Sequence, residues 1–490
     1  MNIDARLSDL ARRHPDRPAL VGTEVLTWQQ LDARTAERTA ELRTDPAGLR
    51  TDAARARTDS ARARTDVVVA VDAGNEPAAA LEVIAYLRAG VPVLPLNPLI
   101  KAAERAAVVA ELQRRGLGVA YRGEVLAAPT SPPAEPTFLP AEPTFLPAEP
   151  TGPPAVAYAL LTGGSTGTPK PVLFPAPLTW SPRTYPNPLL VRTGWRDDQR
   201  QLVVAPLHHA AAFSVFLAGV LCGNTIALLP AFHRDLFWQT LAELDIEWLL
   251  LTPAHMRAAL PGPGRPASSG TPDVTVLHTG APCEPEVKRA WLDLVGPRRL
   301  FEMYGSTEGT GVTLVRGDEW LARPGTVGRG VWTRIRVLDK ELREVPTGTV
   351  GEVYLRTPAP PRLRHPGQRA TPDGYLSIGD HGWVDGDGYL YLTGRGDDLI
   401  IVGGENVYPA EIEAVLRSHP AVVDAAVVGT PDPVLGQRAR AFVIARDLST
   451  DELRRHCAGR LSSFKLPADV TFVDELPRSA LGKLQRRRLT

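Results

Sequence analysis

The sequence predicts an α/β fold. A large N-terminal domain of parallel βα sheets with a small β-barrel-like subdomain is expected, followed by a small α+β C-terminal domain. Between residues 67 and 280, short apolar runs alternate with helical segments, as in parallel sheets that are covered by helices on both faces. After Arg323, Gly and Val alternate with polar residues, which favours antiparallel strands and hairpins. From Tyr408 onward, helices and strands return in a compact order.

Strands of the N-terminal domain are expected where apolar residues run continuously, and helices are expected between these runs. The predicted strand–helix–strand units are 67–74, 76–90 and 91–97; then 201–206, Phe213–Leu221 and 225–230; then 248–253, 255–260 and 274–280. Repetition of this unit implies parallel strands, because a helix between two strands allows them to run in the same direction.

The second half of the chain has a different pattern. Antiparallel strands are expected at 325–330, 333–339, 351–356 and 388–404. The C-terminal order is helix 409–419, strands 422–430 and 438–446, helix 451–461 and strand 470–476. The predicted domains are therefore residues 1–393 and 394–490. Two repeats, RTD at 43–66 and PAEPTFL at 131–154, are interpreted as surface insertions without a chemical role.

Composition excludes several classes of protein. The 490-residue chain has 55 Lys and Arg residues against 55 Asp and Glu residues, whereas a nucleic-acid-binding protein usually carries a basic footprint. The N-terminus lacks an apolar signal-peptide core, and no apolar run is long enough to span a membrane. Cys222, Cys283 and Cys457 are too far apart for a disulfide framework, which fits a reducing compartment. We expect a cytoplasmic protein with neither a nucleic-acid nor a membrane partner.

The segment Leu160–Pro171, LLTGGSTGTPKP, is the first with evident chemistry. Such a loop can direct several backbone N–H groups at one anion, and its hydroxyls and Lys170 add further donors. It is not a Walker A loop, because GxxxxGK[ST] does not fit its sequence. Only six of the 55 basic residues are lysine, so a lysine here stands out. The candidate phosphate-binding residues are Thr162, Gly163, Gly164, Ser165, Thr166, Gly167 and Lys170.

Further motifs follow this loop in a recognisable order. They are PLHH at 206–209, HTGAP at 278–282, EMYGSTE at 302–308, GYLSIGDHG at 374–382, GRGDDLIIVGGENVYPAEIE at 394–413 and PRSALGKLQRR at 477–487. Together they resemble the adenylate-forming superfamily, which includes acyl- and aryl-CoA ligases, peptide-synthetase adenylation domains and luciferases. The resemblance covers nearly the whole chain.

The resemblance implies ATP and Mg²⁺ as cofactors and a role for each motif. Lys483 is expected to stabilise the charge that develops during adenylation, and Thr307 to donate to the α-phosphate. Glu308 is expected to hold Mg²⁺ and His209 to form a wall of the acyl pocket. The expected nucleotide contacts are Gly280, Ala281, Pro282, Glu302, Met303, Tyr304, Gly305, Ser306, Asp380 and Arg395. Among these, Tyr304 offers an aromatic face to adenine, and Asp380, placed at the end of a short strand, accepts the ribose hydroxyls.

The C-terminal domain is implied to be mobile. By the same resemblance, Asp397 is the hinge of a large rotation, and Gly403 and Gly404 line a tunnel for the second nucleophile. The sequence also departs from the family's pattern. Pro171 stands where Gly is usual, Ile378 where Thr is common, and Leu435 and Gln437 where many CoA ligases have an aromatic residue and an acid. FKLP at 464–467 remains compatible with pantetheine passage.

The leading hypothesis is an ATP-dependent ligase that adenylates a carboxylic acid, releases pyrophosphate and transfers the acyl group to a thiol. CoA is the favoured acceptor, and a carrier protein, an amine, or nitrite activation for N–N bond formation are the alternatives. Luciferase-like oxidation is disfavoured, because nothing in the sequence marks an oxygenation pocket. A non-catalytic paralogue is disfavoured because Lys170, Glu308, Asp380 and Lys483 are all present.

The acid is expected to be aryl or hydrophobic. The expected pocket wall, residues 208–220 with Ala281, Cys283 and 309–312, consists mainly of small and apolar side chains. The segment after His209 also offers no carboxylate that could hold an ammonium group.

Overall fold

The computed structural model describes residues 1–44, 67–100, 102–121, 124–125, 156–162, 170–175, 177–182, 187–260, 273–307, 309–358, 368–402, 405–432, 435–478 and 484–489. The chain forms two compact units. Unit 1 comprises Met1–Leu250 with Pro272–Thr275, and unit 2 comprises Leu251–Thr271 with Val276–Thr490. Residues 45–66 and 131–154, which contain nearly all of the two repeats, lie outside the described residues. The domain boundary expected near residue 394 stays a prediction.

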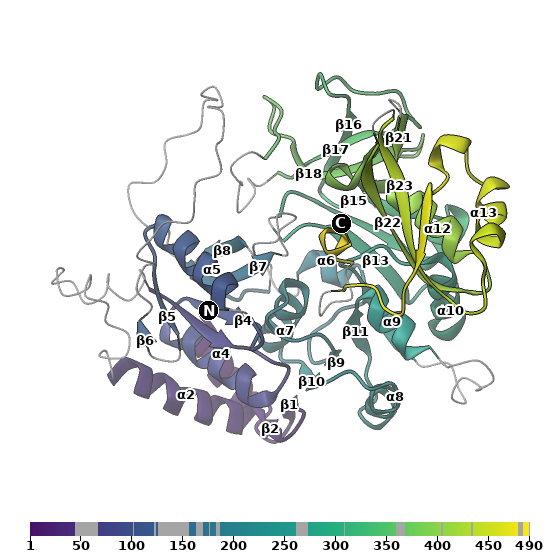
Figure 1. Ribbon diagram of the computed structural model, residues 1–490. Coiled ribbons are helices and arrows are strands. Elements are labelled where there is room, and N and C mark those ends of the chain that lie inside the picture. The colour runs from purple at the N-terminus through teal and green to yellow at the C-terminus, as the bar shows by residue number, and fades with distance from the viewer. Residues whose placement is uncertain are drawn as a thin grey trace. The chain divides into compact units, whose positions relative to one another are not determined.

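One sheet of unit 1 has the order β6-β5-β3-β4-β7-β8. Its strands are β3 (Val67–Asp72), β4 (Val93–Leu96), β5 (Gly118–Tyr121), β6 (Glu124–Val125), β7 (Val156–Thr162) and β8 (Lys170–Pro175). β3 pairs in parallel with β4 and β5, and β4 pairs in parallel with β7. Helix α4 (Pro77–Ala89) contacts β3 and β4, and α5 (Ala102–Arg114) contacts β5 and β8 (Figure 1). The predicted strand–helix–strand unit at 67–97 is confirmed.

A further run of hydrogen-bonded strands in unit 1 has the order β11-β9-β10-β1-β2. Its strands are β1 (Pro18–Val21), β2 (Val25–Thr27), β9 (Arg200–Val203), β10 (Thr225–Leu228) and β11 (Trp248–Leu251). Between or beside them lie α1 (Ile3–Arg13), α2 (Trp28–Thr44), α6 (Pro188–Val191), α7 (Ala210–Cys222) and α8 (Arg234–Glu243). Helix α7 begins three residues before the predicted Phe213, because Ala210–Ala212 continue the helix back to an extended His209.

Unit 2 contains the predicted antiparallel region. Its elements are α9 (Pro253–Ala259), β12 (Thr275–His278), α10 (Pro285–Val295), β13 (Leu300–Gly305), β14 (Val312–Arg316), α11 (Gly317–Ala322), β15 (Thr326–Gly330), β16 (Arg334–Leu338), β17 (Gly351–Arg356), β18 (Leu376–Val384) and β19 (Leu390–Arg395). β12 and β13 are parallel, and β13 then pairs antiparallel with β14. The strand order continues β14-β15-β19-β18-β17-β16. Asp380 lies within β18 and not at the end of a short strand, because the left-handed Gly379 (φ +84°) interrupts the strand without ending it.

The C-terminal elements follow the predicted order. They are η2 (Gly396–Asp398), β20 (Ile400–Val402), β21 (Glu405–Val407), α12 (Pro409–Arg417), β22 (Val422–Asp432), β23 (Gly436–Ala445), α13 (Thr450–Ala458), η3 (Ser463–Lys465), β24 (Asp469–Phe472) and η4 (Arg486–Arg488). Ile412 of α12 and Leu453 of α13 share one apolar core with Val427 and Val443 of the sheet. Both helices therefore bury their apolar sides on this sheet, as an α+β domain requires. The predicted fold class is confirmed.

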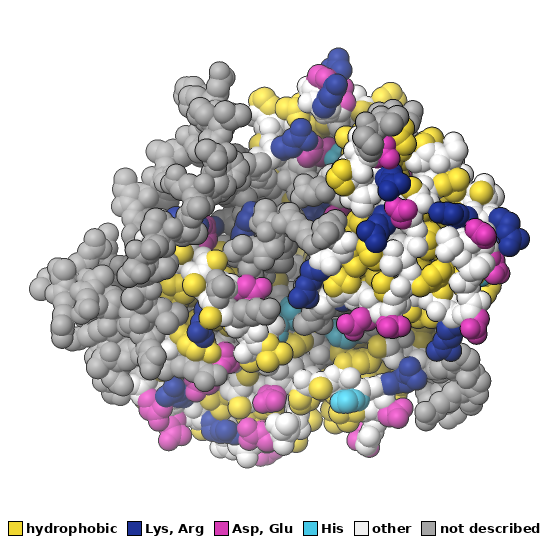
Figure 2. Space-filling view, in the orientation of Figure 1, with side chains coloured by type: hydrophobic (Ala, Val, Ile, Leu, Met, Phe, Trp, Pro, Cys, Tyr) yellow, Lys and Arg dark blue, Asp and Glu magenta, His cyan; other side chains and the backbone are white. Residues whose placement is uncertain are grey.

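Charges of both signs are mixed on the surface. Figure 2 shows Lys and Arg side chains interspersed with Asp and Glu on the face in view. In the part of the chain that the structure describes, no helix combines the length and the apolar character needed to cross a membrane. The balanced charge counts in the sequence thus correspond to a mixed surface on this face.

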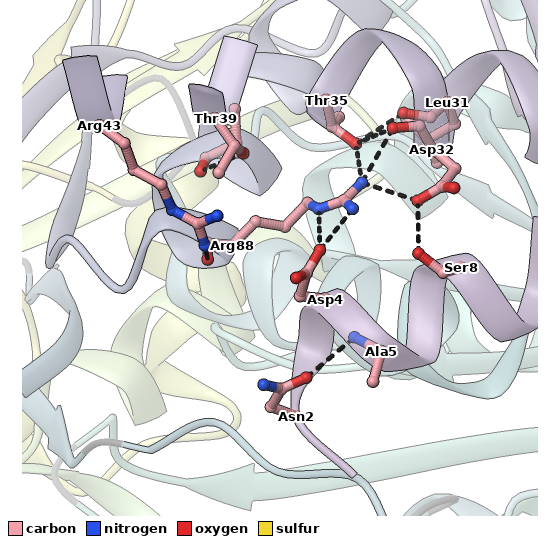
Figure 3. A network of polar contacts seen from close by, with 11 residues as sticks. Asn2, Asp4, Ala5, Ser8, Leu31, Asp32, Thr35, Thr39, Arg43 and Arg88 are labelled. Carbon is pink, nitrogen blue, oxygen red and sulfur yellow. Dashed lines mark hydrogen bonds and ion pairs between the residues drawn. The ribbon is translucent and has the colours of Figure 1, made fainter. Parts of the chain in front are cut away.

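A buried arginine links three helices of unit 1 (Figure 3). The Arg88 side chain, at the end of α4, is only 4% exposed. Its guanidinium donates to Asp4 of α1 and, in α2, to the Asp32 carboxylate at 2.8 Å and the Thr35 hydroxyl at 2.7 Å. A guanidinium has five donors in a fixed plane, so one side chain can hold two helices against a third.

We predict that Arg88→Met lowers the free energy of unfolding by about 3 kcal/mol, because two carboxylates lose the cation between them. Chemical denaturation monitored by circular dichroism measures this change. Arg12→Ala is the matched control, since the Arg12 side chain is 71% exposed and its ion pair with Asp9 spans 3.6 Å. Equal effects of the two substitutions would contradict a special role for the buried arginine.

Candidate functional site

The two ends of the predicted phosphate loop lie together in unit 1. Thr162 and Lys170 are direct partners across the antiparallel pair β7–β8. Leu161, next to Thr162, forms a parallel bridge with His209. The strand pairing therefore brings Thr162, Lys170 and His209 to one end of β7. Gly163, Gly164, Ser165, Thr166 and Gly167 lie outside the described residues.

Two adjacent histidines precede helix α7. The Nδ1 atom of His208 lies 2.9 Å from the carbonyl oxygen of Ala73, and the two imidazole rings are 4.1 Å apart. Burial lowers the pKa of His208 and outweighs the opposing effect of the Ala73 hydrogen bond. His208 therefore acts as a neutral structural group. His209, which caps α7, stays the predicted pocket residue of the pair.

The predicted adenine segment lies in unit 2, between β12 and α10. Gly280 has φ +94°, and a Cβ built there would meet no atom within 4 Å. The backbone at this residue is therefore open and has a conformation that glycine adopts readily. Next to it, the Thr279 hydroxyl donates to the carbonyl of Met303 at 2.7 Å and joins this segment to β13. Ala281 and Pro282 continue the segment with partly or fully exposed surfaces.

The EMYGSTE motif forms the end of β13 and the turn after it. A Cβ at Gly305 would lie 2.9 Å from the carbonyl oxygen of Gly311, so the close approach of the two chain segments at this point favours glycine. The turn closes where Gly309 N–H donates to the Ser306 carbonyl at 3.1 Å, and the Ser306 hydroxyl lies 3.0 Å from that of Thr310. Thr307 lies within this turn. Glu308 is outside the described residues.

Two predicted nucleotide residues, Tyr304 and Arg395, contact the carboxylate of a third, Asp380. The Tyr304 hydroxyl donates to Oδ2 of Asp380 at 2.7 Å, and Nε of Arg395 lies 3.3 Å from Oδ1. Asp380 and Arg395 are direct partners across β18 and β19. Burial, followed by the Asp380 charge, raises the pKa of Tyr304 well above its ordinary value, so the phenol stays a donor. Sequence reasoning foresaw an aromatic face here but not this hydrogen bond.

Glu302 has a partner that sequence reasoning missed. Its carboxylate forms a buried ion pair with Lys288 of α10. Lys288 follows Val287 and precedes Trp291 and Leu292 on the buried side of that helix, and it is one of only six lysines in the chain. That position among apolar residues was the available signal. Direct contact between Glu302 and the nucleotide stays a prediction.

The C-terminal motif is described only at its ends. The Gln485 N–H donates to the Pro477 carbonyl at 2.8 Å, and Arg478 forms an antiparallel bridge with Leu484. Arg486 then bonds both oxygens of Glu413 at 2.7 and 2.8 Å. These contacts join the two ends of segment 479–483. Lys483, Gly403 and Gly404 lie outside the described residues, and the structure does not describe the side chain of Asp397.

The prediction of a Mg²⁺ site rests on the sequence alone. Within the described ranges, no group of three or more His, Cys, Asp or Glu side chains could hold a metal ion. Because Glu308 lies outside those ranges, its role as a Mg²⁺ ligand stays a prediction.

Known proteins share both the sequence and the fold. Residues 7–360 match the family described as AMP-binding enzyme, and residues 411–483 match the AMP-binding enzyme C-terminal domain. A sulfoacetate–CoA ligase from Cupriavidus necator is 34% identical over 358 residues, which are 69% of this chain and 67% of that protein. A fatty acid–[acyl-carrier-protein] ligase from Streptomyces coeruleorubidus is 35% identical over 347 residues, 67% of this chain and 66% of that protein.

Solved structures agree on the architecture. The o-succinylbenzoate CoA synthetase of Bacillus subtilis, in complex with its acyl-adenylate intermediate, superimposes with a TM-score of 0.75 at 23% identity. The superposition covers 99% of this chain and 97% of that chain. This likeness establishes the fold.

We predict that Tyr304→Phe raises the KM for ATP roughly tenfold. The Asp380 carboxylate, a charged acceptor, then loses the hydrogen bond that the Tyr304 hydroxyl donates. Steady-state pyrophosphate release measures the change, with kcat expected to stay within a factor of about two. Tyr389→Phe is the control, since the Tyr389 hydroxyl donates to Glu319 at 2.9 Å outside the predicted nucleotide contacts. An unchanged KM in Tyr304→Phe would rule out this role for the phenol.

Proposed function

We propose, since the chain belongs to the AMP-binding enzyme family, that it is an ATP-dependent ligase that joins a carboxylic acid to a thiol. In the first step, a carboxylate oxygen attacks the α-phosphorus of ATP, and pyrophosphate leaves. In the second step, the thiol attacks the carbonyl carbon of the acyl-adenylate, and AMP leaves. The observation that carries the proposal is the Tyr304–Asp380–Arg395 contact, which lies in the same unit as the open backbone at Gly280.

The adenosine part of ATP fits the described residues of unit 2. A carboxylate accepts several hydrogen bonds, and Asp380, held by Tyr304 and Arg395, is assigned to accept from the ribose hydroxyls. Because its partners come from β13 and β19, the carboxylate is fixed before the sugar arrives. The bare backbone at Gly280 admits a flat ring at close approach.

The phosphates of ATP are assigned to residues other than those proposed for the adenosine. Lys170 and the glycine-rich loop before it are assigned to the phosphates, and Thr307 to the α-phosphate. Lys483 is assigned to the carboxylate and the α-phosphate, where an ammonium group offsets developing negative charge. Mg²⁺, when bound, would neutralise phosphate charge, and Glu308 is the residue assigned to hold it.

The acid is proposed to be aryl or hydrophobic. The exposed or half-buried residues at the start of α7 include Ala210 and Ala211, which have small apolar side chains. Phe213 and Phe216 of the same helix are fully buried. The acids in the names of the similar proteins differ widely, so the proposal on the acid rests on α7 alone.

CoA is the proposed acceptor, and a carrier protein is the second candidate. The two similar curated proteins are named as ligases for CoA and for an acyl carrier protein. The proposal includes rotation of residues 394–490 against residues 1–393 about Asp397 between the two steps. It also includes a cytoplasmic location, supported by three cysteines that are all free thiols.

We predict that Lys483→Ala lowers adenylation roughly 100- to 1000-fold, because one donor to the developing charge is lost. Acyl transfer from supplied acyl-adenylate should remain largely intact. Pyrophosphate release measures the first step, and thioester formation measures the second. Lys340→Ala, which removes a lysine that is 86% exposed, is the control. Equal loss of both steps would contradict the assignment of Lys483 to adenylation.

An acceptor panel tests the proposal as a whole. With ATP and a set of aryl, aliphatic and amino acids, we expect pyrophosphate release to be greatest with aryl or hydrophobic acids. Addition of CoA should then convert the adenylate into a thioester, detected by mass spectrometry. A product that forms only with carrier protein, an amine or nitrite would replace CoA as the acceptor. Absence of pyrophosphate with every acid would reject the ligase.

A further inference from the structure

We propose that Lys288, through its ion pair with Glu302, fixes the distance between the Gly280–Pro282 segment and the Tyr304–Thr307 segment and thereby sets the affinity for ATP. Lys288 is a positioning residue in this role, since it acts through Glu302. The inference rests on the proposed function, because it takes these two segments as the adenosine site.

Lys288 and Glu302 lie on elements that are directly connected to the two segments. Strand β12 leads into Gly280–Pro282 and then into α10, which carries Lys288. Strand β13 carries both Glu302 and Tyr304. The ion pair therefore joins the helix that follows the first segment to the strand on which the second segment begins.

The second step is that the first segment is fastened at both ends to neighbouring residues of β13. On one side, the Thr279 hydroxyl donates to the carbonyl of Met303 at 2.7 Å. On the other side, Lys288 pairs with Glu302. Residues 280–287 thus lie between two attachments to adjacent residues of β13, and Glu284 within them also forms an ion pair with Arg257 of α9. Of these contacts, the Thr279–Met303 and Lys288–Glu302 contacts fix the segment relative to Tyr304, so loss of either one loosens that placement.

The third step concerns the burial of the two charges, which ties the position of each charge to that of its partner. The Lys288 and Glu302 side chains are 2% and 9% exposed. The Lys288 ammonium also lies 4.8 Å from the ring centre of Trp320, which gives its remaining surface a favourable contact. A buried charge that loses its partner is costly, so each member of the pair constrains the position of the other.

The fourth step is that two neighbouring titratable groups, His278 and Cys283, do not compete for the pair. His278, opposite Glu302 in the strand register, is fully buried, and burial together with the Lys288 charge lowers its pKa well below the ordinary value. Burial and the Glu302 charge raise the pKa of Cys283 to about 12. At neutral pH both groups are therefore uncharged. Lys288 and Glu302 thus form a matched pair of one cation and one anion.

Lys288→Met tests the inference in the full-length enzyme. We expect the Kd for ATP, measured by equilibrium dialysis, to rise at least tenfold. The KM for supplied acyl-adenylate should rise in parallel, while the KM values for the acid and the thiol stay unchanged. Lys340→Met, which removes an exposed lysine, should leave all four constants unchanged. A folded Lys288→Met enzyme with wild-type ATP affinity would overturn the inference.

The double variant Lys288→Met with Glu302→Leu separates positioning from stability. Apolar replacement of a buried ion pair is often neutral or stabilising, so the melting temperature should recover toward wild type. The Kd for ATP should remain high, because the attachment is still missing. Recovery of both would show that the pair only balances charge, which also overturns the inference. If the wild-type enzyme binds no ATP at all, the proposed function fails instead.

Discussion

The parallel pairing of neighbouring strands is the constraint on which the described nucleotide residues depend. Parallel strands end at the same edge of a sheet, so the segments that follow them must lie together. In unit 2, the parallel register of β12 and β13 places His278 opposite Glu302. The segment after His278 and the residues after Glu302 therefore start side by side, and the Thr279–Met303 hydrogen bond and the Lys288–Glu302 ion pair then fasten them to each other. The antiparallel pair β18–β19 adds Asp380 and Arg395 opposite each other.

Much of this arrangement could be predicted from the sequence, because its signals are local. Continuous apolar runs identified the parallel strands, and the change to alternating residues marked the antiparallel region. The motif at 278–282 could be placed at the end of the predicted strand 274–280 on the same grounds. No strand was predicted at 300–305, so the position of the motif at 302–308 on β13 was not foreseen. The predicted position of Asp380 failed on a local signal as well. Gly379 suggested the end of a strand, whereas the left-handed glycine lies inside β18.

The parts that could not be predicted are long-range polar contacts. Lys288 pairs with Glu302, fourteen positions away. Arg88 reaches Asp32 and Asp4 across 56 and 84 positions. A charged residue is normally expected at the surface, so sequence reasoning did not place Arg88 or Lys288 in the interior. Only the folded chain shows which charges face one another. The spacing of apolar residues along the sequence indicates which positions are buried, but it does not indicate which side chains contact each other.

The Arg88 contacts have a consequence for changes in the length of the chain after α2. They hold α2 at Asp32 and Thr35, whereas the RTD repeat begins at Arg43 in its last turn. The packing of α2 is thus complete before most of the repeat begins. Lengthening a connection is cheap, about 0.6 kcal/mol for each doubling. Because seven-residue units correspond to whole codons, replication slippage could add or remove copies between α2 and β3 without shifting the reading frame. A change in the number of repeat units is thus compatible with the contacts that hold α2.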